Sequence, residues 1–392
     1  MQSFPSRYRV PLFLLTLVSV LLVTSGCAGW FGVRVSSSPT ANLNIATFTE
    51  SHLDAYRDRV TIVVPEVYEL MQVAIALTST SQEHPYRYTD PDTAYYQAVM
   101  DHFAPYRDHA LIEALDDALS GPTAYRATFA YHFDGDELVE GGQYSVTGLN
   151  RAFEGLLPEM EAFARESGFR AFYADHADFY QAQVDTYRRV VDPAHIWQWM
   201  EANFPARYDA YTIVLSPLMN GTNNTWRFRD REAGYEEIVM FAPSPNVFAP
   251  DVEDPDVNIS QEVADVILAR AVFTEIDHNY VNPVTDEHLK AIDRAMRPLE
   301  AWNEGAGSYG SPALTFNEYF TWAIFGLYAE TRYEPSLAAA AWDRTRAMMD
   351  WRGFPRFDAF YEELHNAYSE RRTDETVADL LPEMIAWMQD VD

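Results

Sequence analysis

Two residue types are nearly missing from this sequence of 392 residues, which contains one cysteine, Cys27, and one lysine, Lys290. A single cysteine excludes an internal disulfide framework and a cysteine-based zinc site. Basic residues are scarce altogether, because 28 Lys and Arg stand against 59 Asp and Glu, and the formal net charge is −31 at pH 7. Since every contact with a phosphate group needs a nearby cation, we expect no nucleic-acid partner and little attraction to anionic lipid.

The sequence also lacks two common catalytic signatures. It has no G-x-S-x-G motif for a serine nucleophile and no glycine-rich phosphate loop. What it has is a globular composition, with 48% apolar and 14% aromatic residues. The acid excess is typical of a surface that stays hydrated in salt, with a cationic partner as the alternative. Because there are 59 acidic residues, a glycosidase-type pair of carboxylates stays open.

The N-terminus has the pattern of a bacterial targeting segment. Two arginines precede an apolar run at positions 10–23, whose 14 residues are too few to cross a bilayer comfortably. The run leads into 24-TSGC-27, which resembles the bacterial lipobox, although threonine stands at the first position where leucine is usual. We therefore predict a lipoprotein signal peptide over residues 1–27 and a lipid on Cys27.

The lipid on Cys27 predicts a protein anchored in a membrane of the cell envelope. The next residue is Ala28 and not Asp, which resembles the pattern of outer-membrane sorting in Gram-negative lipoproteins. Residues 28–43 contain a Ser-Ser-Ser-Pro stretch and indicate a tether. Residues 44–392 show no internal repeat and no clear linker, so they are expected to form a single domain.

Apolar periodicity predicts helices over most of this domain and a small antiparallel sheet before its middle helix. Strands are indicated at 59–64, 211–219, 226–230 and 237–243. Ser260 then caps a helix over residues 261–281, and the proline two positions beyond is expected to end it. The predicted fold class is α+β, mostly helical, with the small antiparallel sheet preceding the motif helix.

This helix carries the stretch 273-FTEIDHNYVNP-283. Glu275 and His278 are three residues apart and are therefore neighbours on the helix surface, beside an otherwise apolar stripe. A buried carboxylate next to an imidazole is costly unless a metal ion, a mutual hydrogen bond or an arginine pairs with it. The pattern is close to His-Glu-x-x-His, in which two histidines bind zinc and the glutamate accepts a proton from zinc-bound water. Thr274 takes the place of the first histidine.

Seven segments carry a wider resemblance: 67-VYELMQVAIALT-78, 95-YYQAVMDHFAPYRDHALIEAL-115, 172-FYADHADFYQAQ-183, 213-IVLSPLMNGTNN-224, 273-FTEIDHNYVNP-283, 317-NEYFTWAIFGLY-328 and 353-GFPRFDAFYEEL-364. In them the chain resembles an uncharacterised family of bacterial secreted and lipid-anchored proteins that is described as a domain of unknown function. Members of that family often carry a fuller His-Glu-x-x-His-x-x-x-Asn-Pro motif and an Asn-Glu or similar pair on a later helix. That layout is similar to the gluzincin zinc metallopeptidases.

The resemblance implies a zincin-like fold and a zinc site. It makes His278 and Glu318 zinc ligands and Glu275 the general base. Asp277 or Asn282 would hold the second ring nitrogen of His278, as residues behind a metal ligand do. The sheet would lie where zincins pair an edge strand with an extended peptide.

The chain departs from the family at Thr274, because threonine is a poor neutral ligand and a catalytic zinc usually has three protein ligands. Glu275 could become a ligand itself, as carboxylate–histidine pairs on helices do. His176 or His132 could enter the site from elsewhere. The site could also have lost its metal.

Two functions follow as alternatives. The first is an envelope-anchored lipoprotein with a zinc metallopeptidase-like domain that hydrolyses peptides. The second is a catalytically inactive relative that binds a peptide or a glycan.

A zincin-like fold makes one prediction that the structure tests directly. The carboxylate of Glu318 must lie within about 5 Å of His278. A larger separation would remove the support for the resemblance.

Overall fold

The computed structural model describes residues 43–84, 88–118, 123–140, 155–220, 223–245, 259–304 and 309–391. The predicted signal peptide, Cys27 and the predicted tether up to residue 42 lie outside these residues. Within them the chain is mostly helical, with one central sheet and one small hairpin, in agreement with the predicted α+β class. None of the described helices combines the length and the apolar character that a membrane crossing requires.

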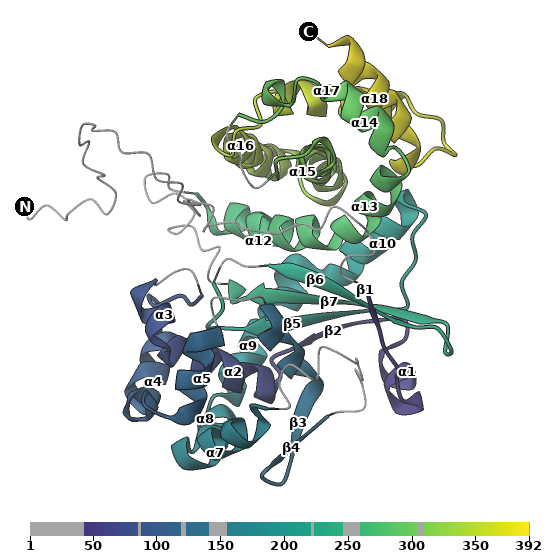
Figure 1. Cartoon of the computed structure of the whole chain (residues 1–392). Coiled ribbons are helices and arrows are strands. Elements are labelled where there is room, and N and C mark those ends of the chain that lie inside the picture. The colour runs from purple at the N-terminus through teal and green to yellow at the C-terminus, as the bar shows by residue number, and fades with distance from the viewer. Residues whose placement is uncertain are drawn as a thin grey trace, which may run out of the picture.

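The central sheet has five strands in the order β1-β6-β7-β5-β2 (Figure 1). They are β1 Leu43–Ile45, β2 Arg59–Val63, β5 Ala210–Ser216, β6 Asn224–Asp230 and β7 Tyr235–Pro243. All four strands indicated by the sequence are present. The prediction of an antiparallel sheet is wrong, because only β6 and β7 run antiparallel, whereas β1 with β6, β5 with β7 and β2 with β5 are parallel pairs.

The connections between the strands explain their directions. A turn at residues 231–234 joins β6 to β7, and so short a connection allows only an antiparallel pair. A long helical stretch separates β2 from β5, and a crossover of that kind returns the chain in the parallel direction. β1 pairs with β6 along Arg227–Arg229, so the chain's own N-terminal strand covers part of the edge at which a peptide strand was expected.

The sheet lies between two layers of helices (Figure 1). The layer drawn below it contains α2 Glu66–Leu77, α3 Ser79–Glu83, α4 Ala94–Phe103, α5 Ala110–Ala118, α7 Leu157–Ser167, α8 Phe169–Asp175 and α9 Ala177–Thr186, together with the hairpin of β3 Tyr131–Asp134 and β4 Glu137–Glu140. The layer drawn above it contains α12 Gln261–Ile276, α13 His278–Asp286, α14 Leu289–Ala295, α15 Pro312–Arg332, α16 Pro335–Trp351, α17 Phe357–Glu370 and α18 Leu381–Asp390. Two further helices are α1 Glu50–Tyr56 and α10 Pro193–Asn203, of which α10 packs against α12.

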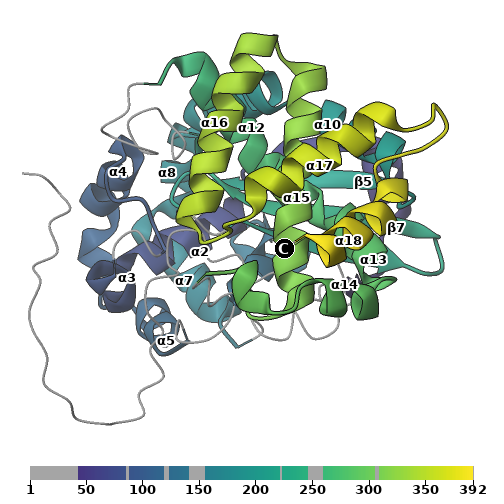
Figure 2. The ribbon, with the colours of Figure 1, turned by 90° about the horizontal axis from the view of Figure 1, so that it is seen from above.

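The upper layer is arranged around α15. From above, α15, α16 and α17 are seen packed against one another (Figure 2). The prediction of a helix over 314–330 is confirmed and extended at both ends. Ser311 accepts a hydrogen bond from the backbone N–H of Leu314 at 3.3 Å, and Pro312 occupies the first turn, which are both typical of a helix start.

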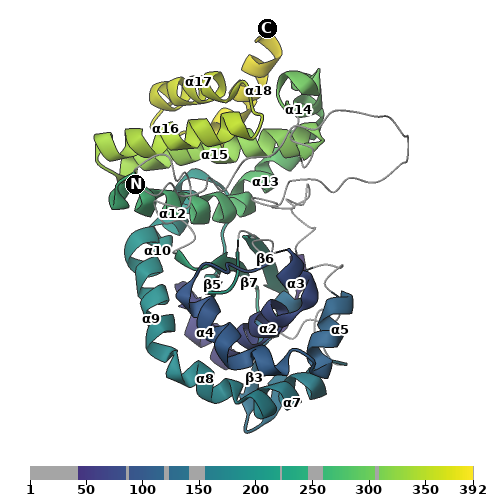
Figure 3. The same ribbon diagram turned by 90° about the vertical axis from the view of Figure 1, so that its left-hand side faces the viewer.

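The helix α12 separates the sheet from α15 and α16 (Figure 3). Ser260 caps it as predicted, by accepting a hydrogen bond from the N–H of Val263 at 3.4 Å. Most of its side chains are buried because the helix contacts β6 and β7 on one side and α15 and α16 on the other. A helix covered on several sides has no need of a polar face, which explains its apolar sequence.

The predicted single helix over 261–281 is in fact two helices. The first ends at Ile276, Asp277 stands between them, and the second begins at His278. Pro283 does not end a helix but lies inside α13. The Glu-x-x-His pair therefore spans a helix junction.

A tyrosine explains why α13 continues through Pro283. Proline has no N–H, so the carbonyl of Asn279, four residues earlier, lacks its usual helical partner. The hydroxyl of Tyr208 donates a hydrogen bond to that carbonyl at 2.6 Å. Tyr208 lies shortly before β5, far from α13 in the sequence. The residues of 261–281 therefore do not by themselves predict this contact.

We expect Tyr208→Phe to lower the free energy of unfolding by about 1–2 kcal/mol, because the buried carbonyl of Asn279 loses its donor. Urea unfolding followed by circular dichroism measures the loss. In a Pro283→Ala background residue 283 regains an N–H for the same carbonyl, so Tyr208→Phe should cost less there. Equal losses in the two backgrounds would contradict this role of Tyr208.

Candidate functional site

The Glu-x-x-His pair lies where α12 gives way to α13. Thr274 and Glu275 belong to the last turn of α12, Asp277 connects the helices, and His278 begins α13. All four side chains are buried. The neighbouring helix α15 packs against both α12 and α13 at this junction. Four polar residues therefore lie inside the protein, where each needs a partner or, for an acid, a proton.

The structure brings Glu318 of α15 to His278. Glu318 Oε1 is 3.9 Å from His278 Nε2, so the separation of less than about 5 Å that the sequence required is met. Glu318 Oε2 accepts hydrogen bonds from the guanidinium of Arg352 at 2.6 Å and from the indole N–H of Trp322 at 3.1 Å. One carboxylate oxygen is thus held firmly while the other faces the imidazole.

Arg352 follows directly after α16 and is the strongest partner of Glu318. Its side chain is 8% exposed, and its guanidinium carbon lies 4.8 Å from the ring centre of Trp322 and 5.1 Å from that of Tyr309. The guanidinium also donates to the hydroxyl of Tyr309. A cation close to aromatic rings and beside a carboxylate has its charge compensated by several neighbours.

Glu275, the predicted general base, is surrounded by charges of both signs. Burial and the nearby carboxylate of Glu318 raise the pKa of Glu275 to about 8, while Arg126 and Arg352 act in the opposite direction. Arg126 belongs to the 3₁₀ segment Thr123–Ala130 and lies over the ring of Phe241 in β7. With a pKa of about 8, Glu275 carries a proton at neutral pH in the metal-free protein.

Asp277 is a second buried acid at the junction. Burial raises the pKa of Asp277 well above its ordinary value, and the carboxylates of Glu318 and Glu275 add to the rise. The Thr321 hydroxyl and the N–H of His278 are close enough to lower the pKa in part, although neither carboxyl oxygen of Asp277 has a well-aligned hydrogen bond among the described residues. Burial therefore favours the protonated form of Asp277 as well.

His278 is a neutral imidazole in this setting. Burial lowers the pKa of His278, against the opposing influence of Glu318 and Asn282. Its Nε2 faces Glu318, and its Nδ1 has no well-aligned hydrogen-bond partner within the described part of the chain. Asn282, one turn further along α13, is among the groups that act on the pKa of His278, whereas Asp277 is not, and no well-aligned hydrogen bond joins either side chain to the ring in the described structure.

Within the described residues, neither Thr274 nor the two histidines named above supplies the missing first ligand. The hydroxyl of Thr274 is directed to the carbonyl of Ala271 in its own helix, at 3.4 Å. His176 lies in the opposite helical layer, where its Nδ1 is 2.8 Å from the carbonyl oxygen of Phe172. His132 is an exposed residue of β3. The structure therefore does not bring either histidine to the junction.

These residues do not complete a catalytic zinc site. His278 Nε2 and Glu318 Oε1 are two donors, whereas such a zinc takes three protein ligands. No group of three or more His, Cys, Asp or Glu in the described ranges is arranged to hold a metal ion. Glu275 lies close enough to Glu318 for that carboxylate to raise its pKa, and with a pKa of about 8 its carboxyl group is mostly neutral at pH 7.

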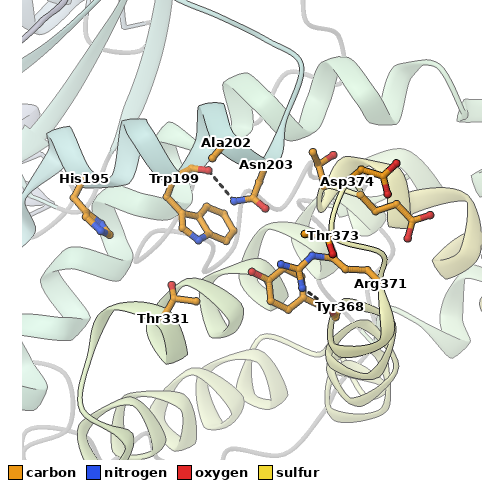
Figure 4. Close-up of a pocket in the computed structure, with 11 residues that line it drawn as sticks. His195, Trp199, Ala202, Asn203, Thr331, Tyr368, Arg371, Thr373 and Asp374 are labelled. Carbon is orange, nitrogen blue, oxygen red and sulfur yellow. Dashed lines mark hydrogen bonds between the residues drawn. The ribbon is translucent and has the colours of Figure 1, made fainter.

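A second feature, which sequence reasoning missed, is a pocket of about 450 Å³ between α10, α15 and α17 (Figure 4). Trp199 and Asn203 come from α10, Thr331 from α15, Tyr368 from α17, and Arg371 from the segment after it. These residues lie far apart in the sequence. No local motif brings them together, so only the packing of the helices could reveal the pocket.

Comparison with known proteins gives one positive result. A family model described as a domain of unknown function, DUF4932, matches residues 151–385. The matched range contains β5 to β7, both helices of the Glu-x-x-His junction, Glu318, and the pocket of Figure 4. No curated protein and no solved structure matches the chain significantly.

The raised pKa of Glu275 predicts a pH dependence with a definite sign. Its folded pKa of about 8 lies above the ordinary value of 4.5, so the folded protein holds an extra proton between these values. The stability that this proton contributes is complete at low pH and is lost as the pH rises through about 8. Glu275→Gln imitates the protonated form and should lessen the fall in unfolding free energy between about pH 5 and 9, by on the order of 2 kcal/mol.

The measurement is urea unfolding of both proteins at a series of pH values. Glu262→Gln is a matched control, because Glu262 lies in the first turn of the same helix and is exposed. This control should follow the wild type over the same pH range. If the wild type and Glu275→Gln gave parallel curves, Glu275 would not titrate in this window.

Proposed function

The chain belongs to the DUF4932 family, whose function is unknown, and we propose that it is a metallopeptidase-like protein that has lost metal-dependent hydrolysis and acts as a binding protein. In this proposal the protein is anchored in the cell envelope by a lipid on Cys27, and its folded domain binds a ligand there. The proposal is carried by one observation. The position of the first ligand holds Thr274, whose hydroxyl is directed to the backbone of its own helix.

The electrostatics of the junction support this proposal. A buried carboxylate needs a compensating cation, and in a gluzincin the metal supplies that charge to its ligands. Here the guanidinium of Arg352 lies 2.6 Å from Glu318 Oε2. The pKa of Glu275 is raised to about 8 and that of Asp277 is also raised, so burial favours the uncharged form of both acids. The cluster therefore has its charges balanced by its own side chains.

The pairing of the sheet edge also supports a mode of ligand binding that differs from the way a zincin binds its substrate peptide. A substrate peptide of a zincin adds to a free strand edge. The outer edge of β6 is paired with β1 along Arg227–Arg229, which leaves less of that edge for a peptide. This favours a ligand that binds elsewhere on the domain, such as a glycan.

A second candidate function, a zinc-dependent peptidase-like hydrolase, is favoured by the spacing of His278 and Glu318. A separation of 3.9 Å is too long for a hydrogen bond but suits two atoms that share one metal ion, since zinc–ligand bonds of roughly 2 Å place them up to about 4 Å apart. Glu318 Oε2 is anchored by Arg352 and Trp322, as ligating carboxylates commonly are. Glu275 would then act as the third ligand or as the base.

Zinc content separates the two candidates. We expect the purified domain, from residue 28 on, to contain well below one equivalent of zinc and to leave peptide substrates intact. Thr274→His supplies the missing imidazole one turn before His278, and should raise the zinc content to about one equivalent per chain. Thr274→His combined with His278→Ala is the matched control and should lose that zinc.

The opposite outcome supports the hydrolase. In that case the wild-type protein already carries about one equivalent of zinc, and the His278→Ala variant carries none. The wild type also hydrolyses peptides, and Glu275→Gln abolishes this activity. Either result is read from metal analysis and a peptide-cleavage assay on the same preparations.

The anchor is tested separately in a Gram-negative host. Cys27→Ser removes the acceptor of the lipid, so the protein should move from the membrane fraction to the soluble fraction and lose incorporation of labelled palmitate. Ala28→Asp leaves the lipid in place but should change the membrane in which the protein is found. Unchanged membrane association of Cys27→Ser would disprove the anchor.

A further inference from the structure

The pocket of Figure 4 has the size of an ordinary small-ligand site and is formed by three helices of the upper part of the fold. Its volume is about 450 Å³. Two aromatic residues, Trp199 and Tyr368, face it from different helices, together with the amide of Asn203 and the hydroxyl-bearing Thr331 (Figure 4). The lining therefore alternates aromatic surface with polar groups that can fix the orientation of a ligand.

Trp199 is held rigidly at the pocket wall. Its ring packs on Phe273 of α12 at 5.6 Å between centroids and on Tyr328 of α15 at 5.7 Å, the latter edge to face. Both partners are buried. The indole N–H of Trp199 has no hydrogen-bond partner among the described residues, so it is available to a ligand. A fixed aromatic ring with a free donor offers a ligand both contact area and a hydrogen bond at little entropic cost.

Further polar groups at the pocket are also available. The amide nitrogen of Asn203 donates to the carbonyl of Trp199 at 2.9 Å, which leaves Oδ1 as an acceptor. The hydroxyl of Tyr368 has no partner in the described part of the chain. His195 meets the hydroxyl of Tyr328 through Nδ1 at 3.2 Å, and burial lowers the pKa of His195, so it is neutral at pH 7. Acceptors and donors are thus mixed, and none of these three groups carries a charge.

The charges around the pocket do not favour an anionic ligand. Arg371 is the cation of the lining, but its guanidinium lies over the ring of Tyr368 and donates to the Tyr368 carbonyl. Asp374 and Glu375 also line the pocket and pair with Arg372. The two carboxylates are thus compensated by Arg372, and the formal charge of −31 of the whole protein disfavours an anionic ligand at longer range.

We propose that this pocket binds a neutral saccharide of one to three sugar units. The C–H face of a sugar ring packs against an aromatic ring, and its hydroxyl groups both donate and accept hydrogen bonds, as the lining of this pocket requires. The proposal deepens the proposed function, on which it rests, because it names the site and the ligand class of the binding protein. A peptide with a free carboxylate fits less well, since the protein as a whole has a formal charge of −31.

The test is isothermal titration calorimetry of the purified domain with maltotriose, cellotriose and chitotriose, and with an acidic hexapeptide for comparison. We expect at least one trisaccharide to bind and the acidic peptide not to bind. Trp199→Phe keeps the aromatic packing but removes the indole N–H, and Tyr368→Phe removes only a hydroxyl. Each should weaken saccharide binding about 3- to 10-fold.

Trp197→Phe is the matched control. Trp197 is on the same helix two residues earlier, and its indole N–H already donates to Glu201 at 2.9 Å. This variant should bind the saccharide as the wild type does. Thermal unfolding of all three variants tests whether each is folded. If Trp199→Phe does not fold, Tyr368→Phe still tests the proposal.

Three results would each overturn the proposal. None of the three trisaccharides binds, saccharide binding falls equally in Trp197→Phe and in the pocket variants, or the acidic peptide binds in place of a saccharide. The proposed function fails on different evidence, namely stoichiometric zinc and peptide cleavage by the wild type. The two failures are therefore distinguishable on the same protein preparations.

Discussion

The ion pair between Glu318 and Arg352 is the contact on which the buried site depends. It joins α15 to the end of α16 and places a full negative and a full positive charge inside the protein, 2.6 Å apart. Burial of either charge alone would be strongly unfavourable, so each residue keeps the other in place. The pair orients Glu318 toward His278. The negative charge of Glu318 adds to the rise in the pKa of Glu275 and of Asp277.

The same helix α15 connects this junction with the pocket of Figure 4, yet the two are separate places. Glu318 and Thr331 are thirteen positions apart, which corresponds to about 20 Å along a helix. Phe273 and Tyr328 lie between them and form the wall against which Trp199 packs. The helices α12, α13 and α15 therefore contribute to two separate places, the buried junction around Glu318 and the wall of the pocket.

Much of the fold was predictable because local signals were strong. The serine cap and the apolar pattern located the start of α12, the apolar run located α15, and the strands β2, β5, β6 and β7 were recognised from their residue types. The strand directions and the junction at Asp277 were not predicted. The parallel directions depend on pairing between strands that are far apart in the sequence, such as β1 with β6 and β2 with β5. The continuation of α13 through Pro283, which was also missed, depends on a distant contact, that of Tyr208 with the carbonyl of Asn279.

The sequence by itself determined the residue types of the candidate site, because it shows the Glu-x-x-His spacing and the threonine at position 274 directly. The resemblance found in the sequence also predicted that Glu318 lies near His278, and the two are 3.9 Å apart. Only the tertiary structure decided their chemical state. Arg352 reaches Glu318 from 34 positions away, and the pKa of Glu275 follows from burial between helices. Spacing along a chain fixes neighbours on one helix, whereas desolvation and charge pairing depend on which distant residues pack against it.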